Sequence, residues 1–224
     1  MKPAYLMMLS AFYVGCADIR ETAADITTIT LGSEYIKPVK IDQSVKLSDQ
    51  PIIACIPIEV ALPERNAVVS LQPSAAGCAL TLTQPALTLF DKKQIDNARK
   101  QAGRFDIDGI RGGSVELMQI ELLNADDQPL PLEQYVDAVT VTVDGSVLLD
   151  RMPPDALLNE QPKRKLPDPL LEKLKTSVKQ GQPATADVVL TLWLSSWVIQ
   201  DVPTALKMTL LIQPELEVSL LEAL

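Results

Sequence analysis

Histidine is absent from the 224 residues, and its absence removes much of the acid–base chemistry open to a chain of this length. Histidine is the side chain that titrates near neutral pH and the usual base beside a serine or cysteine nucleophile. It is also a common zinc ligand. Catalysis by paired carboxylates or by tyrosine remains open, but no spacing of acids selects a pair. We therefore expect a non-catalytic protein without a cofactor.

The pair Asp106 and Asp108, followed by Gly109, invites a calcium interpretation. If Gly109 were the turn glycine of an EF-hand loop, Arg104 would stand at the first ligand position and Val115 at the last, where carboxylates are needed. A looser site that includes Glu116 is the alternative to an exposed strand turn. We favour the turn and predict no metal site.

Cys55 and Cys78 lie 23 positions apart, each in a segment typical of a β-strand. In an oxidising compartment these two thiols could form one disulfide, which would stabilise the fold by about 3 kcal/mol in the loop-entropy account. The alternative is two separately buried thiols. Neither cysteine has surroundings typical of a catalytic nucleophile.

The first residues are organised as an export signal: Lys2, an uncharged run from Ala4 to Val14, and Gly15 directly before Cys16. The uncharged run is about half the length that a membrane-spanning helix needs. Its end, Tyr13-Val14-Gly15-Cys16, resembles the lipobox of bacterial lipoproteins, in which the peptide is cut before a cysteine that carries the lipid. The resemblance implies a signal peptide over residues 1–15, lipidation of Cys16 and a lipidated tether over residues 16–25. Ala17 implies, by the same resemblance, sorting to the outer membrane.

The charge balance bears on the partner. The chain has 29 acidic and 20 basic residues, a formal net charge of −9. Affinity for phosphate backbones rests on clustered lysine and arginine, so nucleic acid is not an expected partner. The implied partners are the membrane, through the N-terminal lipid, and another protein of the cell envelope.

The elements that must position these residues are mostly strands. Segments between residues 26 and 90 are β-branched and partly alternating, and five prolines between residues 50 and 90 exclude a helix of ordinary length there. In 114–123, alternation places Val115, Leu117 and Gln119 on one face and Glu116, Met118 and Ile120 on the other. Asp144-Gly145 is typical of a hairpin turn.

Two helices stand out from this pattern. The first covers residues 91–102, with Asp91 as its cap and Gly103 as its stop; its charges indicate a solvated face more than a docking site. The second covers residues 168–180, with Asp168 as its cap and Pro169 at its first position. Its apolar stripe consists of Leu170, Leu171, Leu174 and Val178. The basic run Lys163–Lys165 before it is interpreted as a solvated loop, with contact to anionic lipid headgroups as the alternative.

The strand over residues 187–197 supplies the candidate binding surface. Alternation places Val188, Leu190, Leu192 and Leu194 on one face and both tryptophans, Trp193 and Trp197, on the more polar opposite face. Exposed aromatic side chains commonly bind proteins or stack on sugars. The alternative is that this strand is covered on both sides and that the tryptophans belong to the core.

These patterns predict a mainly β protein with an antiparallel, immunoglobulin-like β-sandwich architecture and two or three short helices. We expect an N-terminal β-rich unit over 26–90, a helix and connection over 91–113, and a C-terminal sandwich-like unit over 114–224; one irregular domain is the alternative.

Three functions are compatible with these residues and patterns. We favour a lipid-anchored lipoprotein of the bacterial cell envelope, on the periplasmic or surface side of the outer membrane, that acts as an interaction or structural module. A binder of lipids or small apolar ligands would instead need a cavity between the leucine-rich strands and the helix at 168–180. A glycan-acting enzyme would need two acids in a cleft near Trp193 and Trp197.

Overall fold

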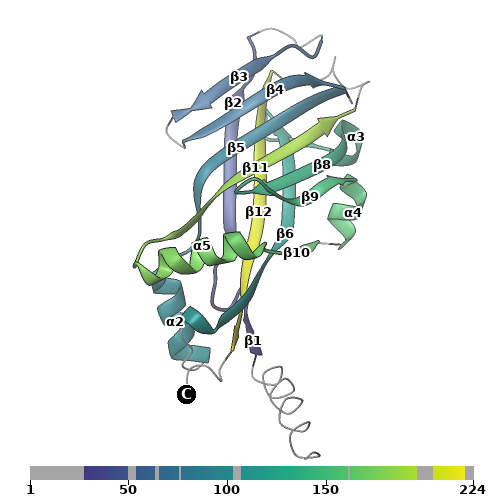
Figure 1. The fold of residues 1–224 in the computed structure, drawn as a ribbon. Helices are drawn as coiled ribbons and strands as arrows, with labels where there is room; N and C mark the ends of the chain where they lie inside the picture. The colour runs from purple at the N-terminus through teal and green to yellow at the C-terminus, as the bar shows by residue number, and fades with distance from the viewer. Residues whose placement is uncertain are drawn as a thin grey trace, which may run out of the picture.

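The described part of the chain forms two antiparallel sheets of six strands each, which confirms the predicted mainly β, sandwich-like fold. The computed structural model describes residues 28–49, 54–63, 66–75, 77–102, 107–160, 162–195 and 204–219. Cys16 and Trp197 lie outside these residues, as do the predicted signal peptide and tether. In Figure 1 the strands of one sheet run across those of the other.

The first sheet, here the β12 sheet, is organised around β12 (Ala205–Ser219). On one side β12 pairs along its length with β6 (Ile110–Asn124), and on the other side first with β2 (Val39–Lys46) and then with β1 (Thr28–Leu31). Two short strands, β7 (Pro129–Leu130) and β10 (Lys163–Lys165), pair with the outer edge of β6.

The second sheet, here the β11 sheet, has β11 (Ala184–Leu194) between β5 and β8. Its strand order is β3 (Ile58–Leu62), β4 (Ala67–Ser74), β5 (Gly77–Phe90), β11, β8 (Val136–Val143) and β9 (Ser146–Met152). The β8–β9 turn is formed by Asp144 and Gly145, as predicted, and both residues have positive φ. A type I′ hairpin turn requires that conformation at both central positions.

One continuous core joins the sheets. Alternate side chains of each strand point inward, so that Leu190 and Leu192 of β11, Val69 of β4 and Leu210 of β12 are all completely or almost completely buried. Burial of such a side chain stabilises the fold by roughly 1.5–3 kcal/mol. The alternation predicted for β11 is therefore confirmed, and it assigns Trp193 to the outer face.

Four α-helices lie in the described residues: α2 (Lys92–Ala102), α3 (Leu132–Tyr135), α4 (Pro154–Glu160) and α5 (Asp168–Lys179), together with a short 3-10 helix, η2 (Ile107–Gly109). No helix in these residues is long and apolar enough to cross a membrane. The predicted helices correspond to α2 and α5, and the four predicted stripe residues of α5 are all buried. The predicted Asp168 cap is wrong by one position, because the Pro167 carbonyl accepts the Leu171 amide and Asp168 is already helical.

The helix α4 begins at the second of two successive prolines, Pro153 and Pro154. Proline is tolerated in the first turn of a helix, where its missing amide would have no partner in any case. The Pro153 carbonyl accepts the Leu157 amide, which closes the first turn of α4.

The predicted N-terminal and C-terminal units share both sheets. From the range 26–90, β1 and β2 pair with β12, while β5 pairs with β11. From the range 114–224, β11 and β12 are central strands of different sheets. The connection at 91–113 therefore does not separate one sheet from the other.

The face assignment predicted for β6 is wrong beyond Met118. Leu117 lies opposite Ile212 of β12, whereas Gln119 lies opposite the adjacent Leu211, so that Met118 is an extra residue, a β-bulge. The bulge reverses the alternation, and Ile120 is buried on the same side as Leu117 while Gln119 is exposed.

Candidate interaction surface

The predicted disulfide between Cys55 and Cys78 is present, with a Cα–Cα distance of 5.8 Å. Cys78 is the second residue of β5 and is buried, whereas Cys55 precedes the edge strand β3 and is half-buried. The bond therefore joins the segment before β3 to the start of β5, across the intervening strand β4. This attachment restrains the edge of the β11 sheet.

The outer face of the β11 sheet, here the β11 face, carries the side chains that point away from the core. Trp193 is half-buried on this face, between Ala79 of β5 and Ala138 of β8 in the register. The small alanine side chains leave the indole ring room to lie along the sheet. Trp193 is therefore neither a core residue nor a fully exposed one.

Two rows of residues extend the β11 face beside Trp193. Strand register places Glu59, Ser70, Thr81, Thr191 and Thr140 in one row, and Ala61, Val68, Thr83, Val189, Thr142 and Val147 in the next. The hydroxyls of Thr81 and Thr191 form a hydrogen bond of 3.3 Å. Val147 is 57% exposed, an unusually open position for an aliphatic side chain on an edge strand. The rows present hydroxyl and methyl groups to solvent.

The Trp193 ring is fixed by two contacts. Its indole Nε1 donates a hydrogen bond of 3.1 Å to the Thr140 hydroxyl, and the Arg151 guanidinium stacks over the ring at 4.2 Å from its centroid. The backbone amide of Arg151 donates to the same Thr140 hydroxyl at 3.2 Å. One hydroxyl on β8 thus positions both the aromatic ring and the cation above it.

A backbone irregularity in β9 directs Arg151 toward Trp193. Leu149 lies opposite Val141 and Met152 lies opposite Val139, so two β9 residues face one β8 residue. Such a bulge changes the direction of a side chain and is frequent at sheet edges and binding sites. Arg151 also has φ of 47°, a conformation that costs a non-glycine residue about 1 kcal/mol. The strained position is compensated by the contacts to Thr140 and Trp193.

The two outer faces of the sandwich differ in charge. The outer face of the β12 sheet carries Lys40, Asp42, Lys46, Glu116, Glu121, Lys207, Glu215 and Glu217. Among the described residues of the β11 face, charged side chains lie at its margins: Glu59, Asp150 and Arg151 on the edge strands, Asp137 and Asp187 near the strand ends. The centre of the β11 face is therefore uncharged in a protein that is 22% charged residues.

The predicted turn at Asp106–Asp108 bears on the calcium alternative. Asp106 lies outside the described residues. Asp108, in η2, forms an ion pair with Lys179 of α5, and this hydrogen bond lowers the pKa of the Asp108 carboxyl below its ordinary value. Within the part of the chain that the structure describes, no group of three or more acidic or cysteine side chains could hold a metal ion.

The basic run Lys163–Lys165 forms the edge strand β10 instead of the predicted loop, although all three residues are exposed. Lys163 forms an ion pair with Glu215 of the β12 sheet. Backbone pairing with β6 explains the strand, and its cations discourage pairing of this edge with another chain.

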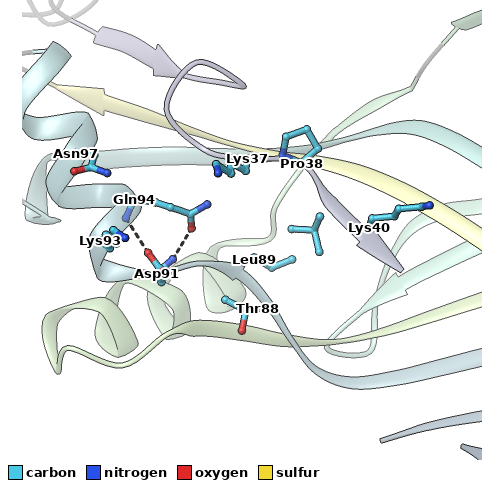
Figure 2. A pocket seen from close by; sticks show the side chains of 10 residues that line it. Lys37, Pro38, Lys40, Thr88, Leu89, Asp91, Lys93, Gln94 and Asn97 are labelled. Atoms are coloured by element: carbon cyan, nitrogen blue, oxygen red, sulfur yellow. Dashed lines mark hydrogen bonds between the residues drawn. The ribbon is translucent and has the colours of Figure 1, made fainter. Parts of the chain in front are cut away.

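Two surface pockets bear on the alternative functions. One, of about 620 Å³, lies between the start of β2, the end of β5 and α2, and Figure 2 shows its lining of polar and apolar side chains. The other, of about 290 Å³, lies beside Asn124 and Lys207 at the far end of the β12 sheet. Neither pocket is lined by the α5 leucines or by Trp193.

The surroundings of Trp193 bear on the glycan-acting alternative, which needs two acids in a cleft near this ring. The Trp193 ring contacts Thr140 and Arg151, and the nearby Asp137 carboxylate accepts the Ser195 hydroxyl.

No protein-family model matches the chain, and neither a curated protein nor a solved structure is significantly similar to it. The β11 face, with Trp193 near the C-terminal end of β11, is the feature of the described residues with the strongest resemblance to an interaction surface.

Proposed function

We propose that the protein is an exported lipoprotein, anchored through Cys16 in the outer membrane of a bacterial cell envelope, whose sandwich binds another envelope protein through the β11 face. The observation that carries the proposal is the uncharged centre of this face beside Trp193, whose ring Thr140 and Arg151 hold in place. The proposal requires no catalytic group.

The composition of the β11 face agrees with that of known protein interfaces. Charged side chains are depleted at the centre of such interfaces, whereas tryptophan and arginine are enriched among the residues that dominate affinity. Trp193 and Arg151 are held in place before binding by Thr140, so little side-chain entropy would be lost on contact. The strongly charged outer face of the β12 sheet would be much more costly to desolvate.

The disulfide supports the export component of the proposal. Disulfides persist in oxidising compartments and are rare in the cytosol. Cys55 and Cys78 are paired in the described fold, so that after acylation of Cys16 no free thiol would remain among the three cysteines of the chain.

A paired substitution tests the proposal. The full chain would be extracted gently from its own membranes as wild type, Thr83→Arg and Gln119→Arg, and its native mass and co-purifying proteins recorded. Thr83 lies on the β11 face and Gln119 on the outer face of the β12 sheet, so both variants add one cation to an outer sheet surface.

We expect an acylated chain beginning at Cys16 in all three samples. A specific protein should accompany the wild type and Gln119→Arg and be lost from Thr83→Arg. Retention of that protein by Thr83→Arg would contradict the assignment of the β11 face. A mass without acyl groups would contradict the anchor.

A further inference from the structure

The 620 Å³ pocket between β2, β5 and α2 is lined by three lysines in an otherwise acidic protein. Lys37 lies two residues before β2, Lys40 is in β2, and Lys93 comes from the first turn of α2 (Figure 2). The remaining polar lining consists of Thr88, Asp91, Gln94 and Asn97. Asp91 is therefore the single carboxylate among the residues that line this pocket.

The Asp91 carboxylate does not neutralise these lysines by direct pairing. Its Oδ1 accepts the Gln94 amide at 2.8 Å, and the Gln94 side chain in turn accepts the Asp91 amide at 2.8 Å. This reciprocal capping box confirms the predicted Asp91 cap and engages Asp91 with the backbone of α2.

Two of the lysines have their charge available for a ligand. Lys40 forms an ion pair with Asp42 at 3.0 Å, but within the described residues neither Lys37 nor Lys93 forms an ion pair. Both side chains are exposed at the mouth of the pocket. On α2 itself, Lys92 and Lys100 are also exposed, whereas Arg99 is paired with Asp96. The surface around the pocket is thus locally basic.

The pocket lies toward the end of the sandwich at which the described chain begins. Thr28, the first residue of β1, pairs with Ser219 at the end of β12, and Figure 1 shows β1 and α2 at the same end of the molecule. Cys16 precedes Thr28 by twelve residues, which reach at most about 40 Å when fully extended. A lipid on Cys16 would keep this end within about 40 Å of the bilayer.

We propose that Lys37 and Lys93, with the pocket between them, bind the phosphate groups of anionic phospholipids in the membrane that holds the N-terminal lipid. The inference rests on the anchor proposed above and adds a contact that fixes which end of the sandwich faces the bilayer. Each lysine held near an anionic membrane surface shifts occupancy by about fivefold.

The test uses the acylated full chain reconstituted in bilayers. Lysine amines would be labelled with a water-soluble acylating reagent and quantified by mass spectrometry, in pure phosphatidylcholine and in phosphatidylcholine mixed with phosphatidylglycerol. We expect labelling of Lys37 and Lys93 to slow about fivefold in the anionic bilayer and to recover at 1 M salt. Lys165, on the edge strand β10, serves as the internal control and should label equally in both bilayers.

Three outcomes would overturn the inference. Equal labelling of Lys37 and Lys93 in the two bilayers would show that no anionic headgroup is bound. Protection of Lys165 to the same degree would show only non-specific attraction. Equal protection by inorganic phosphate in pure phosphatidylcholine would identify a site for small soluble anions instead.

A matched pair of variants separates this inference from the anchor. Lys37→Gln/Lys93→Gln and Arg164→Gln/Lys165→Gln remove the same charge, and the substituted side chains are exposed. With native acyl groups, only the first pair should weaken the anionic-lipid preference, by roughly 25-fold if the two lysines act additively. An equal effect of both pairs contradicts the pocket, whereas absence of acyl groups from the mass of the chain contradicts the anchor.

Discussion

Thr140→Val tests the idea that one hydroxyl positions both Trp193 and Arg151. The substitution keeps a β-branched side chain of similar shape but removes the acceptor of two hydrogen bonds, from Trp193 Nε1 at 3.1 Å and from the Arg151 amide at 3.2 Å. A typical hydrogen bond contributes about 1 kcal/mol net. Because Trp193 is half-buried and Arg151 exposed, water can replace part of each bond, and we expect a loss of about 1–2 kcal/mol in the free energy of unfolding.

Thr142→Val is the control for this experiment. Thr142 is on the same strand and face and is also half-buried, but its hydroxyl forms no hydrogen bond with another side chain in the described fold. Its replacement should change stability by no more than about 0.5 kcal/mol. Both variants would be made in a Trp197→Phe background, so that the fluorescence signal comes from Trp193.

Urea denaturation followed by circular dichroism would give the stability, and acrylamide quenching would give the accessibility of Trp193. We expect increased quenching in Thr140→Val and unchanged quenching in Thr142→Val. Equal stability and equal quenching in the two variants would refute the role assigned to Thr140. A large loss in both would indicate general sensitivity of the β8 strand.

Three further predictions concern the disulfide, one core residue and one ion pair. Replacement of Cys55 and Cys78 by serine should lower the free energy of unfolding by about 3 kcal/mol, measured by urea denaturation against the oxidised wild type, because the bond closes a loop of 23 positions. Leu174→Ala should cost about 2–5 kcal/mol in the same assay, since Leu174 lies on the apolar stripe of α5 and is completely buried. The pKa of the Asp108 carboxyl is lowered by Lys179, so any stability from this exposed pair should be present above the unfolded pKa and lost as the pH falls through the folded value. Comparison of wild type with Asp108→Asn from pH 7 to pH 2 would check this sign, and a difference that grows toward low pH would contradict it.

Much of the fold follows from alternation and from turn chemistry. In β11, Leu190 and Leu192 face inward and Trp193 outward because every second residue is apolar and no irregularity interrupts the middle of the strand. The stripe of α5 is equally readable, because a 3.6-residue period places Leu170, Leu174 and Val178 on one side. Local patterns therefore suffice wherever the backbone stays regular.

The remaining features depend on long-range register, which local patterns do not carry. The bulge at Met118 in β6 is visible only against Leu211 and Ile212 of β12, strands far apart in the chain. Arg151 gives no signal either, since its role arises from a bulge in β9 that places it over Trp193. The start of α4 is likewise not apparent from the sequence, because two successive prolines usually indicate a loop. The sequence therefore identifies the tryptophan of the candidate surface but not the residues that fix it.

The two proposed contacts use different surfaces, and their separation makes them independently testable. Lys37 and Lys93 line the pocket beside β2 and α2, whereas Thr83 and Trp193 lie on the β11 face and line neither of the two pockets described. Distant sites without shared partners usually show additive effects. An anchored sandwich with one basic end on the membrane would therefore leave its uncharged face open to a second protein. Loss of headgroup protection in Thr83→Arg would contradict this arrangement, because it would mean that the pocket and the β11 face are not independent sites.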